Sequence, residues 1–198
     1  IAYFQAYTNT YAPIERLRKI YTEAAVNDDI AAISIATRPD CLSPEILDLL
    51  SRLNQRKPVW VELGLQTIHE TSANFIRRGY TLDVFEKAVY DLKKIGISVI
   101  VHTILYLPHE TEDMMIETVS YLNRLPIDGI KLQLLHILKG TDLADIYAKS
   151  PFHLPTMDEY FILLGKLLSH LRPDIVVHRL TGDGPKNLLL APQWTGNK

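Results

Sequence analysis

The sequence contains a single cysteine, Cys41, among its 198 residues. One thiol cannot form an intramolecular disulfide, and it cannot build a multi-cysteine metal site. We therefore expect this chain alone to hold no such metal site and to be stabilised by its core, not by disulfides.

Long apolar runs are also lacking. A membrane-spanning helix needs roughly 18 or more consecutive apolar residues, and no such run occurs. The first residues do not have the basic-then-apolar layout of a secretory signal. We expect neither membrane insertion nor export, which makes the cytoplasm the default location.

The chain has little net charge, −2 at pH 7, so it lacks the positive field that drives non-specific nucleic-acid binding. Any contact with nucleic acid must be local. Its apolar content of 47% is enough to bury one sizeable core. We expect a single domain over residues 1–198.

Short β-branched and aromatic runs alternate with stretches of helical period, the pattern of repeated strand–helix units and a parallel sheet. Six strands are expected, at residues 1–5, 31–36, 59–65, 98–105, 129–135 and 175–177. Five helical segments separate them. The first strand begins at Ile1, in the middle of an apolar run, so we expect the chain to be part of a longer protein.

Expected helix boundaries follow from capping signals. Thr10 is a candidate cap for the first helix, Ser43 for the second and Thr111 for a later one, while Gly96 suits the end of the helix before it. The last helix has a broad apolar set that we expect on its buried face. The set is Met157, Tyr160, Phe161, Leu164, Leu167, Leu168 and Leu171.

The sheet is expected to curl. In the strand at residues 59–66, one alternate set is apolar and should face the helices, while the other contains Glu62 and Gln66. The same division places polar residues on the inner face of other strands: Gln5, Ser34, Arg38, His102, Lys131 and Gln133. A sheet covered by helices on both faces should be apolar on both. The fold class is therefore α/β, a partial and open TIM-type barrel of six parallel strands with outer helices.

Several motifs in order carry a family resemblance. Residues 62–67 read Glu-Leu-Gly-Leu-Gln-Thr, residues 77–81 read Arg-Arg-Gly-Tyr-Thr, and residues 103–111 form a strand followed by a Leu-Pro-His-Glu-Thr loop. Together with residues 3–10 and 181–184, they resemble the radical S-adenosylmethionine (SAM) superfamily, specifically its YtqA/YhcC-like branch. That branch is related to the elongator catalytic subunit and to oxygen-independent coproporphyrinogen oxidases. Tyr106 and His109 stand where that family often has glycine.

The resemblance implies two cofactors, SAM and a [4Fe–4S] cluster. The family binds the cluster through a three-cysteine loop after the first barrel strand. Cys41 has no partner and lies too late in the strand order, so we expect the first strand and that loop to precede Ile1. The 198 residues would then be an N-terminally truncated core that is inactive alone.

The resemblance also implies site residues. For SAM these are Gln5, Tyr7, Thr8 and Asn9 at the end of the first expected strand, Glu62 and Gln66 toward the ribose or methionine part, and Arg78 toward the carboxylate. On the substrate side they are His102, Lys131 and Gln133. No metal ligand is assigned in this chain.

Structural explanations compete with these roles. Glu62 and Lys131 could form a buried ion pair, and His102 could be a hydrogen-bonded core histidine. Of the adjacent Arg77 and Arg78, at most one can point inward. His69, His109 and His136 lack the spacing of metal ligands, and residues 181–184 fit a turn better than a nucleotide-binding loop.

The leading functional hypothesis is an enzyme that uses the cluster to cleave SAM to a 5′-deoxyadenosyl radical. Family analogy suggests a tRNA substrate modified at a wobble uridine, and an electron donor such as flavodoxin or ferredoxin. Two alternatives remain open: a cluster-free lyase or aldolase that uses Lys131 as a Schiff-base amine, and a non-catalytic barrel that binds a partner.

Overall fold

A curled sheet of six parallel strands forms the centre of the computed structural model, which describes residues 1–5 and 7–196. The strand order is β1-β2-β3-β4-β5-β7. The strands are β1 (Ala2–Phe4), β2 (Ile33–Thr37), β3 (Val59–Gln66), β4 (Ser98–Leu105), β5 (Gly129–Leu134) and β7 (Val176–Arg179). The expected α/β half-barrel of six parallel strands is confirmed.

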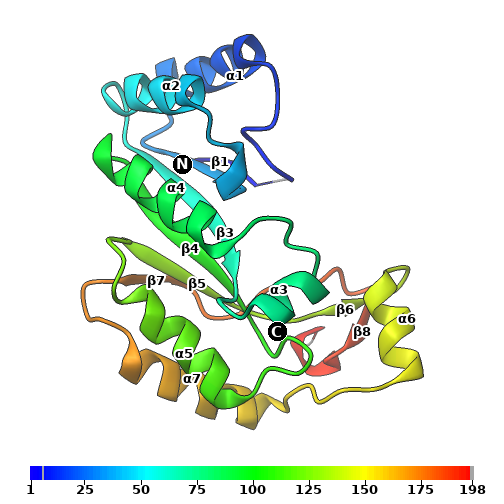
Figure 1. The fold of residues 1–198 in the computed structure, drawn as a ribbon. Coiled ribbons are helices and arrows are strands. Elements are labelled where there is room, and N and C mark those ends of the chain that lie inside the picture. Colours follow the sequence, from blue (N-terminus) through cyan, green and yellow to red (C-terminus); the bar gives the residue numbers. More distant parts are fainter. Residues whose placement is uncertain (6, 197–198) are drawn as a thin grey trace.

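Helices cover the convex side of this sheet (Figure 1). They are α1 (Ile14–Val26), α2 (Pro44–Asn54), α4 (Leu82–Lys94), α5 (Glu112–Leu122) and α7 (Met157–His170). Two shorter helices, α3 (Glu70–Phe75) and α6 (Asp142–Lys149), follow the carboxyl ends of β3 and β6. None of the helices in the described part of the chain has the length and apolar content needed to cross a membrane.

Several short elements were not predicted from the sequence. These are α3, α6, the antiparallel pair of β6 (Ile137–Leu138) with β8 (Leu189–Ala191), and two 3₁₀ turns at Pro39–Cys41 and Gln193–Gly196. Elements of two to eight residues do not repeat a hydrophobic period often enough to be recognised.

The helix caps agree with expectation at three of four positions. The Ser43 hydroxyl accepts from the Ile46 amide, the Thr111 hydroxyl accepts from the Met114 amide, and Gly96 ends its helix at φ +76°. The expectation for Thr10 is wrong.

Pro13 is the N-cap residue of α1, with no side-chain cap. Thr10 is 2% exposed, and its hydroxyl lies 2.5 Å from that of Thr37 and donates to the Cys41 carbonyl at 2.6 Å. Thr10 therefore joins the loop after β1 to the segment after β2, a tertiary role that local capping patterns do not reveal.

The apolar set predicted for the last helix is wrong in part. Met157, Phe161 and Leu168 are exposed by 49%, 57% and 39% of their surface. The buried side chains of α7 are Tyr160, Leu163, Leu164 and Leu167. The helix packs one side against α5, so the remaining apolar residues stay on the outer face.

The two faces of β3 differ as expected. Val59, Val61, Leu63 and Leu65 are each at most 3% exposed and belong to the core beneath the helices. Burying one side chain of this kind contributes about 1.5–3 kcal/mol. The alternate residues, which include Trp60 and Glu62, line the concave side.

Two aromatic side chains lie side by side on the concave side, toward the amino-terminal end of β3. The ring centroids of Trp60 on β3 and His178 on β7 are 6.4 Å apart in an edge-on arrangement. A Cβ atom on Gly129 would lie 2.6 Å from the His178 ring and 3.1 Å from Cγ1 of Ile100. The absence of a side chain at Gly129 therefore allows the ring of His178 to lie against this strand.

We predict that Gly129→Ala lowers the free energy of unfolding by about 1–3 kcal/mol, because the added Cβ would displace the His178 ring and press on the buried Ile100 side chain. The matched control is Gly165→Ala on the exposed side of α7, where an added Cβ meets nothing within 4 Å. That change should stabilise by about 0.5–1 kcal/mol, because alanine favours helix more than glycine does. Urea unfolding measures both. Equal effects of the two substitutions would contradict the packing argument.

Candidate functional site

A buried carboxylate lies at the centre of the concave face. Glu62 on β3 is 4% exposed. Its Oε1 accepts from the Ser34 hydroxyl at 2.8 Å. Its Oε2 accepts from the hydroxyl of Tyr3 at 2.8 Å and from Nζ of Lys131 at 2.5 Å, and lies 2.7 Å from Nε2 of His102. The expected Glu62–Lys131 ion pair is therefore present, within a larger network.

The partners of Glu62 come from four different strands: Tyr3 from β1, Ser34 from β2, His102 from β4 and Lys131 from β5. Nζ of Lys131 also donates to the Tyr3 hydroxyl at 3.1 Å and lies 4.8 Å from its ring centroid. These contacts link β1 to β5 directly across the concave face, although the two strands are not neighbours in the sheet.

The network controls the ionisation of its members. Burial alone would raise the pKa of Glu62, but hydrogen bonds from His102, Lys131 and the two hydroxyls outweigh it and hold that pKa far below its usual range. Burial and the neighbouring Glu62 carboxylate raise the pKa of Tyr3. The centre is thus an ionised carboxylate beside a neutral phenol.

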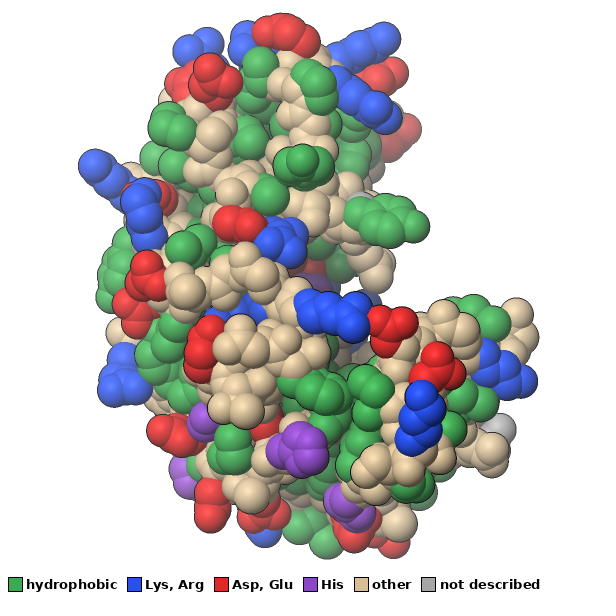
Figure 2. Space-filling view, turned by 45° about the vertical axis from the view of Figure 1, so that its right-hand side comes forward, with side chains coloured by type: hydrophobic (Ala, Val, Ile, Leu, Met, Phe, Trp, Pro, Cys, Tyr) green, Lys and Arg blue, Asp and Glu red, His purple; other side chains and the backbone are tan. Residues whose placement is uncertain are grey.

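A cavity of about 280 Å³ opens above this network, at the carboxyl ends of the strands. Its lining comes from β1 to β5 and their loops: Gln5, Tyr7, Thr8, Ala36, Thr37, Arg38, Glu62, Gly64, Gln66, Tyr80, His102 and Gln133. The surface is hollowed on this side of the molecule, between the upper part that carries α1 and α2 and the lower part that carries α6 (Figure 2).

Seven of the ten predicted site residues line this one cavity: Gln5, Tyr7, Thr8, Glu62, Gln66, His102 and Gln133. Lys131 belongs to the network beneath it. The Asn9 amide donates instead to the backbone carbonyls of Phe4 and Ala36, at 3.0 and 2.9 Å. Asn9 thereby fixes the end of β1 against β2. Ala6, within the same loop, lies outside the described residues.

The two adjacent arginines point in opposite directions, as expected. The Arg77 side chain is 79% exposed and pairs with Asp142 of α6 at 2.8 Å, whereas that of Arg78 is 1% exposed. The Arg78 guanidinium donates to the carbonyls of Thr67 and Tyr80, at 2.7 and 2.9 Å. The Arg78 side chain therefore fixes the loop between β3 and α4 from within, and Arg78 is not among the lining residues of the cavity.

Tyr80 and Arg38 form a part of the cavity wall that the motif comparison missed. The Tyr80 hydroxyl donates to the Gly64 carbonyl at 2.7 Å, and Arg38 lies 5.0 Å from the Tyr80 ring centroid. Arg38 also makes a two-point ion pair with Asp40, at 2.9 and 2.7 Å. Burial raises the pKa of Tyr80 to about 12. Alternation had placed Arg38 on the inner face, but nothing in the sequence indicated its stacking on Tyr80.

Five non-glycine residues in the described part of the chain have left-handed backbone conformations, at the end of β3, after α3 or in loops that follow strands: Tyr7, Gln66, Arg77, Tyr106 and His109, with φ between 56° and 71°. Such conformations cost free energy and gather at functional loops. At Tyr106 and His109 the family often has glycine, the residue that adopts this conformation most readily. The positions thus keep the glycine-like backbone while carrying large side chains.

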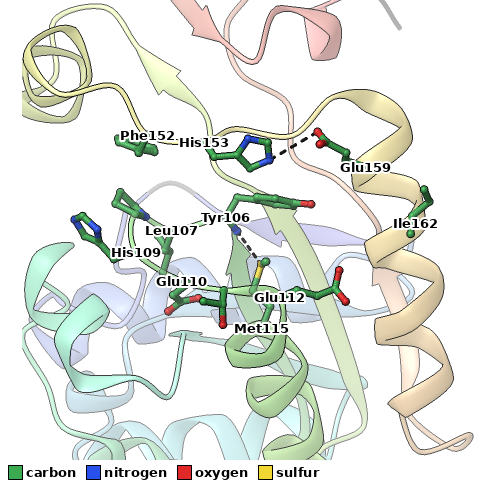
Figure 3. Close-up of a pocket in the computed structure, with 12 residues that line it drawn as sticks. Tyr106, Leu107, His109, Glu110, Glu112, Met115, Phe152, His153, Glu159 and Ile162 are labelled. Atoms are coloured by element: carbon green, nitrogen blue, oxygen red, sulfur yellow. Dashed lines mark hydrogen bonds and ion pairs between the residues drawn. The ribbon is translucent and has the colours of Figure 1, made fainter.

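A second hollow, of about 590 Å³, lies between the β4–α5 loop and the start of α7 (Figure 3). Tyr106 stands in its centre, with Glu112 and Met115 of α5 on one side and His153 and Glu159 on the other. The Tyr106 amide donates to Sδ of Met115 at 3.1 Å. This hollow shares no lining residue with the cavity at the strand ends. It is wider than that cavity, but the convergent polar groups from five strands identify the smaller one as the candidate site.

The described residues contain no group of three or more histidine, cysteine or acidic side chains arranged to hold a metal ion. His69 lies 2.8 Å from the Met114 carbonyl and does not belong to a ligand set. Cys41 is partly exposed, and burial and Asp40 raise the pKa of its thiol. The thiolates that an iron–sulfur cluster needs do not come from this part of the chain.

Arg78→Lys should lower the free energy of unfolding by about 2–3 kcal/mol, because an ammonium cannot replace a planar group that serves several carbonyls at once. The matched control is the neighbouring Arg77→Lys, which should change stability by less than about 0.5 kcal/mol at an exposed pair. Urea unfolding of both variants checks this. A stability loss confined to Arg77→Lys would refute the assignment.

The stability of the fold should depend on pH through Glu62. The pKa of Glu62 is depressed in the folded state, so its contribution to stability is present above its unfolded pKa and is lost as pH falls below about 4.5. Glu62→Gln should cost about 3–5 kcal/mol at pH 7, because it leaves Lys131 without its counter-charge. It should also make the loss of stability below pH 5 shallower by up to about 1.4 kcal/mol per pH unit. Unfolding curves between pH 3 and 7 test this, with Glu117→Gln on the exposed face of α5 as the control. An unchanged acid slope would contradict the depressed pKa.

Comparison with known proteins agrees with this architecture. Residues 1–122 match the Radical SAM superfamily, and residues 127–198 match the Radical_SAM C-terminal domain. The protein YtqA of Bacillus subtilis (strain 168) is 46% identical over all of this chain and 62% of its own length. The protein YhcC of Escherichia coli (strain K12) is 34% identical over all of this chain and 64% of its own length. The chain thus spans about three-fifths of these relatives.

Solved structures repeat the fold. The archaeal Methanocaldococcus infernus Elp3 superposes with a TM-score of 0.82 over 98% of this chain and 51% of its own, at 18% identity. The coproporphyrinogen III oxidase HemN of Escherichia coli gives a TM-score of 0.62 over 82% of this chain and 37% of its own, also at 18% identity. At such identities the likeness concerns the fold alone. With the family matches that cover both halves of the chain, the conclusion is that this protein belongs to the radical SAM superfamily.

Proposed function

We propose that the protein of which this chain forms the core is a radical SAM enzyme, and that the cavity at the strand ends holds SAM and the reacting part of the substrate. The observation that carries the proposal is the convergence of predicted residues from five strands on one polar cavity. Family membership supports the choice of cofactor. Cluster and SAM together would supply a 5′-deoxyadenosyl radical that takes a hydrogen atom from the substrate.

The described residues suit SAM better than they suit the cluster. Gln5, Gln66 and Gln133 bring donor and acceptor groups of side-chain amides to the cavity, which match ribose hydroxyls and the polar ends of methionine. The cluster needs thiolates that these residues lack, so its ligands would have to come from another part of the protein. The role of the described chain is then to bind, to orient and to exclude water.

Each part of the site contributes to that role. The Glu62 network closes the floor of the cavity with paired charges, so that no unpaired ion faces the ligand. The left-handed turn at Gln66 sets the direction of its side chain at the end of β3. Arg38 lines the wall and is held in place by Asp40 and Tyr80. The ligand would therefore meet a floor and an Arg38 side chain that are already fixed in place.

For the substrate, we propose a tRNA, modified at a wobble uridine. The support is family analogy, to which the likeness to an archaeal Elp3 structure adds a fold relationship. With a net charge of −2, contacts to phosphate would be local, through residues such as Arg38 and Arg77. We further propose a cytoplasmic location and an electron donor such as flavodoxin or ferredoxin.

The alternatives receive less support. A Schiff-base mechanism needs an accessible amine, but Nζ of Lys131 is buried beneath the cavity, where it is bound to Glu62 and Tyr3. Borohydride trapping with carbonyl compounds would test that amine directly. A purely structural barrel would have no need of the left-handed loops and polar wall around the cavity.

The decisive test uses the full-length protein, reconstituted anaerobically with iron and sulfide and then supplied with dithionite and SAM. We expect cluster absorbance and release of 5′-deoxyadenosine. Gln66→Asn should lower that release about tenfold at subsaturating SAM, equivalent to a loss of about 1.4 kcal/mol of binding, because asparagine tolerates the left-handed backbone but is one methylene shorter.

The control is Gln55→Asn at the exposed end of α2, which should leave the rate unchanged. Failure of the intact protein to release 5′-deoxyadenosine, with the cluster assembled, would refute the proposed function. An effect of Gln55→Asn equal to that of Gln66→Asn would refute the assignment of the cavity.

A further inference from the structure

The hydrogen bond between His102 and Glu62 fixes the direction of the histidine ring. Nε2 lies 2.7 Å from Oε2 of Glu62, an oxygen that also accepts from Tyr3 and Lys131. The carboxylate is ionised and has no proton to give, so Nε2 must carry the hydrogen. In the neutral ring, Nδ1 then carries the lone pair.

Nδ1 of His102 is the nitrogen left for a ligand. The ring lines the cavity, and the side chain is 18% exposed. Within residues 1–5 and 7–196, no side chain or backbone group forms a hydrogen bond with Nδ1. Gln133 and Gly64, on the strands that flank β4, line the same cavity. A polar hydrogen of a bound molecule could therefore reach Nδ1 from the cavity side.

The charged and titratable groups around the pair come from every neighbouring strand. Tyr3 of β1 and Lys131 of β5 share the carboxylate oxygen with His102. His178 of β7 is close enough that Lys131, Glu62 and His102 all influence its ionisation, while burial lowers its pKa. The charge of Arg179 on β7 partly offsets the rise in the pKa of Tyr3. Arg38 lines the wall of the cavity. Among these groups, the His102 ring combines contact with the ionised carboxylate and access to the cavity.

We propose that His102 is the proton-transfer residue of this site and that Glu62 is its positioning residue. An O–H or N–H bond of the substrate breaks heterolytically, its electron pair stays on the oxygen or nitrogen, and the proton goes to Nδ1. The imidazolium that forms keeps its Nε2–H bond to the Glu62 carboxylate. The reverse step returns the proton. No oxidant or reductant takes part in this transfer.

The proposal narrows the class of substrate. Beside the carbon that reacts, the substrate must carry a hydroxyl, an amine or an amide N–H that can lie about 3 Å from Nδ1. This inference rests on the proposed function, because it places the substrate in the same cavity as the cofactor. It is tested in two arms, of which the first does not need the cluster.

The first arm examines the full-length protein without cluster, labelled with ¹⁵N-histidine, by NMR. We expect the His102 ring, identified by its loss in His102→Gln, to be the tautomer with hydrogen on Nε2 and to show a downfield, slowly exchanging proton. Glu62→Gln should abolish that downfield signal, whereas Glu117→Gln should leave it. A ring with hydrogen on Nδ1, or a signal that survives Glu62→Gln, would overturn the proposal.

The second arm uses the reconstituted enzyme with tRNA from cells that lack its gene. In His102→Gln the modified nucleoside should fall at least 100-fold relative to the 5′-deoxyadenosine released, as expected for loss of a proton-transfer group. Glu117→Gln, on the exposed face of α5, should leave both products at the wild-type rate. The wild-type rate of modification should change with pH, and the residual rate of the variant should not.

The outcomes distinguish the role of His102 from the proposed radical SAM activity. Loss of both products in equal proportion in His102→Gln, or loss of neither, would overturn the role of His102. Absence of 5′-deoxyadenosine from the wild-type enzyme would instead refute the proposed function, and the NMR arm would still decide whether Glu62 positions His102.

Discussion

The structure depends on one buried ion, the carboxylate of Glu62. A carboxylate without partners could not remain charged at 4% exposure, since desolvation would cost several kcal/mol. Donors on four strands compensate that cost, and they can meet only if the sheet curls. The buried charge therefore depends on the curvature of the sheet, and the groups that stabilise it form the polar floor of the cavity.

The inner face could be predicted because alternation along a strand is a local property. Glu62, His102, Lys131 and Gln133 followed from the spacing within their strands, and their convergence followed from the choice of a barrel over a flat sheet. The network around Glu62 could be predicted only in part. The sequence suggested Lys131 as a partner, but the contributions of Tyr3 and Ser34 depend on the register between β1, β2 and β3.

The loops were less predictable for a physical reason. The Asn9 amide binds two carbonyls, the Thr10 hydroxyl joins two loops, and Arg38 stacks on Tyr80. Each of these contacts joins segments far apart in the chain, which a local pattern does not record. The left-handed backbone at Gln66 could not be predicted from the sequence either, because the residue that usually indicates this conformation is glycine.

The contact between Tyr3 and Lys131 has a consequence for the way the chain folds. Its two residues are 128 positions apart, so the loop that closes when they meet contains β2, β3, β4 and the helices between β1 and β5. Contacts of such separation slow folding, because a large loss of chain entropy precedes the gain from the contact. The charged centre of the barrel would therefore assemble late, after the neighbouring strands have paired, and the site would exist only in molecules in which β1 to β5 have come together.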